Sequence, residues 1–102
     1  MQFTVYHNTH PASAYPYLLD VQSDLLDVLS TRLVIPLYPL DKIRTKIPPR
    51  LCPEIEVNGA RYLAMTHEMA SVRRTQIGDV AGNASEQRNQ IKAAIDFLID
   101  SF

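Results

Sequence analysis

The first three quarters of the chain alternate apolar with more polar residues and predict β-strands. In "QFTVYH" at residues 2–7, Phe3 and Val5 share one face, which is the period of two of a half-buried strand. Further strands are expected at residues 17–23, 32–38 and 67–77. Pro36 lies in one of these runs, and because proline has no N–H to donate, we expect an edge or a bulge there.

The segment "EIEVNGARYLAM" at residues 54–65 gives the clearest local signal. Apolar residues alternate with glutamates before Asn58-Gly59, a pair that suits the positive φ angles of a two-residue hairpin turn. The segment at residues 23–31 is compatible with a short helical turn. Residues 39–53 contain a pair of adjacent prolines, so we expect a loop with one short helical turn.

The pattern changes near the C-terminal end, where a single amphipathic helix is predicted. Within residues 83–102, apolar side chains recur at helical spacing on one stripe, at Ile91, Ala94, Ile95 and Leu98. Polar residues lie opposite, at Asn89, Lys92, Asp96 and Asp100. Asn83 and Glu86 have the spacing of a capping box, with Ser85 as the competing cap. The sequence therefore predicts one mainly β domain over residues 1–102, an antiparallel sheet or barrel with one C-terminal α-helix.

Three apolar side chains near the helix end lie off the core stripe. Ile99 falls about 80° from it, and Phe97 lies on the other flank. Phe102 would return to the stripe, but it is the last residue and has no following turn to hold it. Two interpretations are open: these side chains complete one broad core, or they form an exposed patch that contacts a partner.

Composition narrows the class of protein. The chain has 102 residues, 46% hydrophobic and 21% charged, with a net charge of −1. This balance argues against general nucleic-acid binding, which usually shows a basic excess. The single cysteine excludes an internal disulfide. We see neither a signal peptide nor an apolar run of about 18 residues, so a cytoplasmic protein without a membrane span is expected.

Candidate residues for catalysis or metal binding are few. His7 and His10 flank a turn, and the following proline disfavours the helix that would align them, so we expect no metal site. His67 and Glu68 have the chemistry of an acid–base pair, but neighbours on a strand usually point to opposite faces. The sequence thus indicates no metal, no cofactor and no catalytic residue.

Two other features have both a structural and a functional interpretation. Cys52 lies between an apolar residue and a proline and is expected to be a buried small side chain. Arg73 and Arg74 form a basic pair that would suit a phosphate or an acidic partner, or a solvated strand end. No glycine-rich phosphate loop or nucleophile elbow is present in the sequence. The pattern therefore favours a protein that works by binding.

Five sequence blocks carry a resemblance to a known family. They are "MQFTVY" at residues 1–6, "DVQSDLLD" at Asp20–Asp27, "RLVIPL" at Arg32–Leu37, "MTHEMASV" at Met65–Val72 and "RNQIKAAIDFLI" at Arg88–Ile99. In this order they resemble the CcdB family, plasmid or chromosomal toxins that poison DNA gyrase. The resemblance runs from the first residue to the last. "VIPL" followed by "MASV" at this separation is its most specific part.

The resemblance implies a Src-homology-3-like barrel with a C-terminal helix, assembled as a homodimer. It also implies that the dimer lodges in the gyrase A subunit and traps gyrase on cleaved DNA, as a binding protein and not an enzyme, without direct sequence-specific nucleic-acid binding. A CcdA-like antitoxin would neutralise it through a disordered acidic segment that folds on binding. Such pairs serve plasmid maintenance.

The same resemblance implies a gyrase-binding surface. Its residues would be Leu25, Leu26, Asp96, Ile99, Asp100, Ser101 and Phe102. Well-studied members end in Trp-Gly-Ile, and loss of a buried tryptophan anchor can cost about 2 kcal/mol or more. The sequence leaves two alternatives: a homologue with weak or no gyrase poisoning, or an endoribonuclease of the MazF or Kid type, which share the barrel. For the latter, the candidates are His67, Arg73 and Arg74.

Overall fold

The computed structural model describes residues 1–10 and 12–100. The strands are β1 (Thr4–Asn8), β2 (Tyr17–Asp20), β3 (Thr31–Pro39), β4 (Glu54–Val57), β5 (Ala60–Ala64), β6 (Ala70–Arg73) and β7 (Ile77–Asn83). The short 3-10 helices are η1 (Asp24–Leu26), η2 (Leu40–Lys42), η3 (Thr66–Glu68), η4 (Arg74–Gln76) and η5 (Ser85–Gln87). One α-helix, α1 (Arg88–Asp100), follows. No helix in these ranges is long and apolar enough to cross a membrane.

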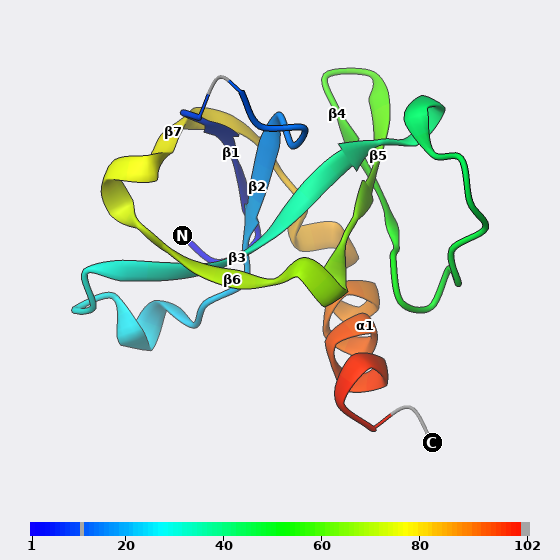
Figure 1. Ribbon diagram of the computed structural model, residues 1–102. Coiled ribbons are helices and arrows are strands. Elements are labelled where there is room, and N and C mark those ends of the chain that lie inside the picture. The colour runs from blue at the N-terminus through cyan, green and yellow to red at the C-terminus, as the bar shows by residue number, and fades with distance from the viewer. Residues whose placement is uncertain (11, 101–102) are drawn as a thin grey trace.

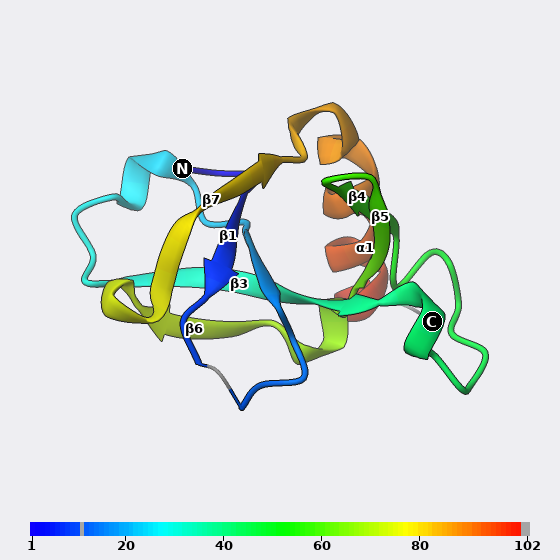
Figure 2. The same ribbon diagram turned by 90° about the horizontal axis from the view of Figure 1, so that it is seen from above.

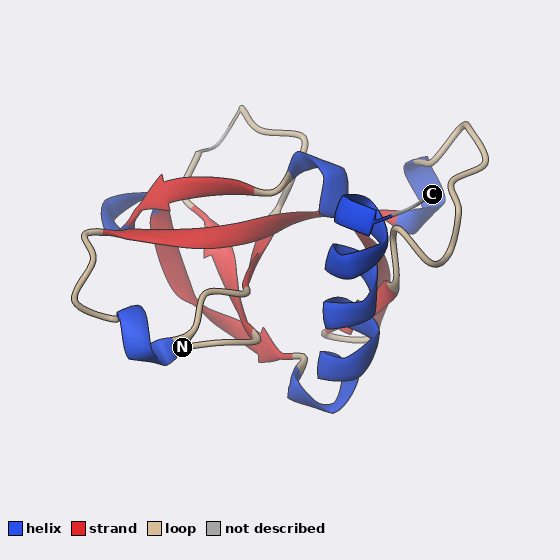
Figure 3. Cartoon of the chain, turned by 90° about the horizontal axis from the view of Figure 1, so that it is seen from below, coloured by secondary structure: helices blue, strands red, loops and turns tan. Residues whose placement is uncertain are grey.

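The strands form one antiparallel sheet that curls into a half-barrel. Its order is β4-β5-β3-β2-β1-β7, with β6 also paired to β3. Helix α1 stands at one end of the curl, beside the β4–β5 hairpin (Figures 1, 2 and 3). This arrangement confirms the predicted class, a mainly antiparallel β-barrel fold of the Src-homology-3-like type with one C-terminal helix.

Strand β3 is the longest strand and changes partner along one of its edges. On that edge Val34 pairs with Ala70 of β6, whereas Leu37 pairs with Ala64 of β5. Pro36 lies between these two positions, and its carbonyl accepts the Met65 amide, so the N–H that proline lacks would face this junction. The pairing with β2 runs through Pro36 without a shift. The predicted edge or bulge at Pro36 is therefore wrong.

The β4–β5 hairpin forms as predicted. Asn58 and Gly59 have φ angles of 52° and 83°, both in the left-handed region that a two-residue turn requires. Apolar side chains of β4 point inward, while Glu54 and Glu56 are exposed on the strand that ends the sheet. The Gln87 side chain donates a hydrogen bond to the Glu54 carbonyl and so covers part of that free edge.

The sequence pattern missed β7 and misassigned the helix cap. Strand β7 contains two glycines and pairs with β1 through an irregular register. At Gly78 an added Cβ would lie 2.9 Å from the His7 carbonyl oxygen, so only glycine fits this close approach. The Asn83 side chain accepts the Ser85 amide two residues later, in an Asx turn, and does not form the predicted capping box.

The core lies between the curled sheet and the first turns of α1. Its buried side chains include Phe3, Val5, Leu19, Ile35, Leu37, Ile55, Val57 and Ile91. Ile91 and Ala94 of the predicted helical stripe are fully buried, and Ile95 and Leu98 are half-buried. Burial therefore weakens along α1 and leaves its last turn outside the core.

Candidate functional site

Four exposed apolar side chains lie together on the loop between β2 and β3. Leu25 is 92% exposed and Val28 is 91% exposed, with Leu26 and Leu29 about half exposed. We call these four residues the apolar prominence. Two of them, Leu25 and Leu26, belong to the predicted gyrase-binding set. Side chains this apolar are normally buried, and a group of them on a surface typically marks an interaction site.

Hydrogen bonds fix the backbone of the prominence. The Ser23 hydroxyl accepts the Leu25 amide, and the Asp27 and Leu29 amides bond to carbonyls three residues earlier. The buried Gln22 side chain donates to the carbonyls of Leu26 and Thr31. The apolar tips therefore stand on an ordered polar base.

A buried ion pair lies beneath this base. Arg32 and Asp20 are 2% and 1% exposed, and the Arg32 guanidinium donates twice to the Asp20 carboxylate at 2.9 and 3.0 Å. Arg32 also donates to the Gln22 carbonyl and to the Asp27 carboxylate. The neighbouring carboxylate of Asp20 raises the pKa of Arg32. The pair is fully bonded, which is the condition under which buried charge is tolerated.

A second arginine reaches the prominence from outside. Arg74, in η4, donates to the Asp27 carboxylate at 2.9 Å and to the Asp27 carbonyl at 2.6 Å. Its Nε donates to the Leu29 carbonyl at 3.0 Å. The hydrogen bond and charge of Arg74 lower the pKa of Asp27. The sequence indicated Arg74 only as half of a basic pair with Arg73. In the structure Arg74 binds Asp27, which lies 47 positions earlier in the chain.

The second part of the predicted surface is the last turn of α1. Ile99 is 63% exposed, and Asp96 and Asp100 are also exposed. The prediction that Ile99 lies off the core stripe is therefore confirmed. Phe97 is half-buried, and the Arg50 guanidinium lies over its ring, 4.8 Å from the ring centroid. Ser101 and Phe102 lie outside the described residues.

The two parts are not brought together within one chain. The η1 segment and the end of α1 lie apart in both Figure 1 and Figure 2, η1 at the left of the view and the end of α1 right of its centre. Strands β3 and β6 run across the space between them. Leu25 and Ile99 therefore belong to two separate surfaces of the chain.

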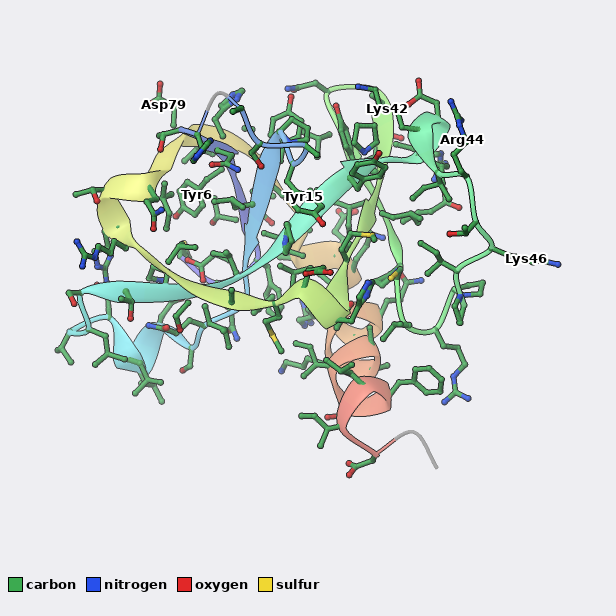
Figure 4. The ribbon with its side chains drawn as sticks, viewed as in Figure 1. Tyr6, Tyr15, Lys42, Arg44, Lys46 and Asp79 are labelled. Carbon is green, nitrogen blue, oxygen red and sulfur yellow. The ribbon has the colours of Figure 1, made fainter. Side chains whose placement is uncertain are left out.

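A groove lies beside α1, on the far side of the molecule from the prominence. The cavity has a volume of about 650 Å³ and is bounded by the 40–53 segment, the β4–β5 hairpin and the first half of α1. Apolar side chains line it, among them Leu40, Ile43, Ile47 and Leu63. Four basic residues of the 40–53 segment are exposed, Lys42, Arg44, Lys46 and Arg50. In Figure 4, Lys46 points away from the molecule.

The residues considered for catalysis do not form one cluster. The His67 ring lies 4.0 Å from Glu68 and 3.9 Å from the Cys52 sulfur, in η3. Arg74 lies in η4, beyond β6, and a four-residue strand spans roughly 13 Å. Cys52 is 1% exposed, as predicted for a buried small side chain, and burial raises the pKa of its thiol. Within the described ranges, no group of three or more potential metal ligands is found.

Two proteins of known structure are among those that share this fold. One is an endoribonuclease in complex with its cognate antitoxin from Mycobacterial species, with a TM-score of 0.75, 14% identity, and coverage of 97% of this chain and 93% of that one. The other is the Mycobacterium tuberculosis toxin MazF-mt6, with a TM-score of 0.75, 11% identity, and coverage of 95% and 96%. At these identities the likeness shows the fold alone.

This likeness corrects one expectation from sequence. The chain was expected not to be an enzyme, because no catalytic motif was recognised. One protein of the same fold is named an endoribonuclease, and the finding overturns that expectation. Because one fold can host different functions, a missing motif does not decide whether a protein of this fold is an enzyme.

The family of this chain is shown by a sequence match over nearly its whole length. The sequence model of the family described as CcdB protein matches residues 2–101, which includes all of the five blocks on which the resemblance rested except Met1. The match covers the prominence, the groove and α1 alike. The chain belongs to the CcdB protein family and is a toxin of a toxin–antitoxin system.

Proposed function

We propose that this toxin binds the A subunit of DNA gyrase and traps the enzyme on cleaved DNA. The observation that carries the proposal is the exposure of Leu25 and Ile99, at 92% and 63%, on a chain of the CcdB family. Interfaces take much of their binding energy from a few apolar anchors that become buried. Leu25, Leu26, Asp96, Ile99, Asp100, Ser101 and Phe102 are the proposed contact residues.

The proposed active form is a homodimer acting in the cytoplasm, where it would meet gyrase. The separation of η1 from the end of α1 supports this assembly, because a twofold axis places equivalent surfaces of two copies on one face. A symmetric toxin also matches a symmetric target, since the proposed partner is the gyrase A dimer. Two copies would then present two prominences and two helix ends.

The proposed antagonist is a CcdA-like antitoxin with an acidic, disordered segment. The groove beside α1 suits such a segment, because its lining is largely apolar and includes Arg50 and Arg61, and because Lys42, Arg44 and Lys46 are exposed on the 40–53 segment that bounds it. Charge complementarity of this kind favours rapid encounter and correct partner choice. A mycobacterial protein of the same fold has been solved with its cognate antitoxin, which supports a partner of this class.

The experiment is binding of the purified protein to purified gyrase A subunit, followed by a DNA cleavage assay. We expect a stable complex and linear DNA after protein denaturation. Leu25→Asp and Ile99→Asp should each weaken binding about tenfold or more, since each places a charge at an apolar anchor. Val80→Asp is the matched control, because Val80 is 66% exposed and lies outside the proposed surface.

Single-stranded RNA incubated with the same preparation provides the opposing test. Cleavage of that RNA, together with no complex with gyrase A, would reject the proposal in favour of RNA as the target. Removal of residues 100–102 should leave the fold intact and abolish DNA trapping.

A further inference from the structure

We propose that Arg74 is a positioning residue that holds the apolar prominence in a preformed shape for its partner, and that Val28 and Leu29 extend the contact surface beyond Leu25 and Leu26. This inference rests on the proposed function, because the partner it names is the gyrase A subunit. It adds residues that the resemblance does not supply.

The first step is the contrast between exposed tips and a fixed backbone. Leu25 and Val28 are more than nine-tenths exposed, yet the Leu26, Asp27 and Leu29 amides are all hydrogen-bonded within the loop. An exposed loop rich in apolar residues would ordinarily collapse onto the protein or move freely. Here the backbone is already ordered, so a partner pays little of the entropy that ordering a loop costs.

The second step is the source of that order. Arg74 makes three hydrogen bonds to the loop, to the Asp27 carbonyl, the Asp27 carboxylate and the Leu29 carbonyl. From the other side, Arg32 donates to the same Asp27 carboxylate at 3.2 Å. Arg32 also forms the buried ion pair with Asp20, whereas Arg74 is 44% exposed. Arg74 can therefore be changed with little effect on the core.

The third step is the kind of partner. Between Ser23 and Thr31 the chain carries Asp24 and Asp27, and both carboxylates are already paired, Asp27 with Arg74 and Arg32 and Asp24 with Arg32. The prominence is thus an apolar tip on a charge-balanced polar base. It fits an apolar protein surface. Continuity with Leu25 and Leu26 assigns that surface to the gyrase A subunit, and a second copy of this chain is the competing occupant.

The test compares Arg74→Gln with Arg73→Gln, the neighbouring arginine as a matched control. Amide hydrogen exchange is measured on the free toxin, and we expect faster exchange at Leu26, Asp27 and Leu29 in Arg74→Gln only. Binding to gyrase A should weaken about five- to tenfold, mainly through faster dissociation. Arg74→Lys should recover part of both effects. Val28→Ser should weaken binding without changing exchange.

The outcomes separate this inference from the proposed function. Unchanged exchange in Arg74→Gln overturns the positioning role. Faster exchange with unchanged gyrase binding, while Leu25→Asp still weakens binding, also overturns it and leaves the proposed function standing. Loss of self-association in Val28→Ser, with gyrase binding retained by the monomer, assigns the surface to a second copy instead. If the unmodified toxin fails to bind gyrase A, both proposals fall.

Discussion

The Arg50 guanidinium lies over the Phe97 ring, 4.8 Å from its centroid, and joins the 40–53 segment to the last half of α1. Arg50 lines the groove proposed for the antitoxin. Phe97 lies two residues before Ile99, in the turn proposed to contact gyrase. One cation–π contact therefore connects the two proposed binding surfaces.

Removal of this contact should loosen the end of α1. We expect Arg50→Met to lower the free energy of unfolding by about 0.5–1 kcal/mol, the range for a partly exposed cation–π pair. Urea unfolding of Arg50→Met, Phe97→Leu and the double variant gives the contribution of the Arg50–Phe97 contact as a coupling energy. Additive effects of the two single changes would show that the stacking contributes nothing.

The buried ion pair beneath the prominence should be far more costly to break. Arg32→Met leaves the buried Asp20 carboxylate with only the Met1 ammonium and the Gln22 amide as donors, and we expect a loss of up to about 3–5 kcal/mol of stability. Arg61→Met is the control, because Arg61 and Glu54 form an exposed pair and should contribute at most about 1 kcal/mol. Denaturant midpoints of the two variants give the comparison. Equal losses would mean that burial does not set the cost.

Acid should release the prominence before it unfolds the protein. Arg74 holds the pKa of Asp27 below its ordinary value of 3.8. This pairing is therefore complete above the unfolded-state pKa and is lost as the pH falls through the lower, folded-state pKa. An NMR titration of the Asp27 carboxyl should give a pKa below 3.8 that rises in Arg74→Gln. An unshifted pKa in the unmodified protein would argue against the pairing in solution.

The hairpin turn should tolerate no side chain at Gly59. Its φ of 83° is unfavourable for alanine, although nothing lies within 4 Å of an added Cβ. We expect Gly59→Ala to cost roughly 1–2 kcal/mol. Gly82→Ala is the control, since its added Cβ would meet ordinary contacts at 3.9 and 4.0 Å. Thermal unfolding compares the two, and an equal loss in both would exclude backbone strain as the cause.

The sequence predicted best those elements that local chemistry determines. Asn58-Gly59 specifies its turn through its own backbone preference, and the stripe of α1 is visible in its spacing. Strand β7 was missed because its glycines weaken the strand pattern and because its order comes from pairing with β1, which lies far earlier in the chain. The prediction at Pro36 failed for a related reason. Whether a proline disturbs a sheet depends on which neighbouring strand its missing N–H would face, and only the fold gives that neighbour.

The candidate site divides along the same line. Leu25, Leu26 and Ile99 followed from the family resemblance, and their exposure agrees with a surface role. The contribution of Arg74 was not predictable, because a basic pair in sequence does not reveal a carboxylate brought to it from the loop after β2. Long-range polar contacts of this kind depend on the completed fold.

The outer strand β4 has a consequence for how this toxin can exist in high concentration. Open sheet edges invite other chains to add a strand, which is a common route to amyloid-like aggregates. Here two glutamates flank that edge and the Gln87 amide occupies one of its free carbonyls. Addition of a strand from another copy at β4 is thereby disfavoured, and the folded protein can remain dispersed at high concentration.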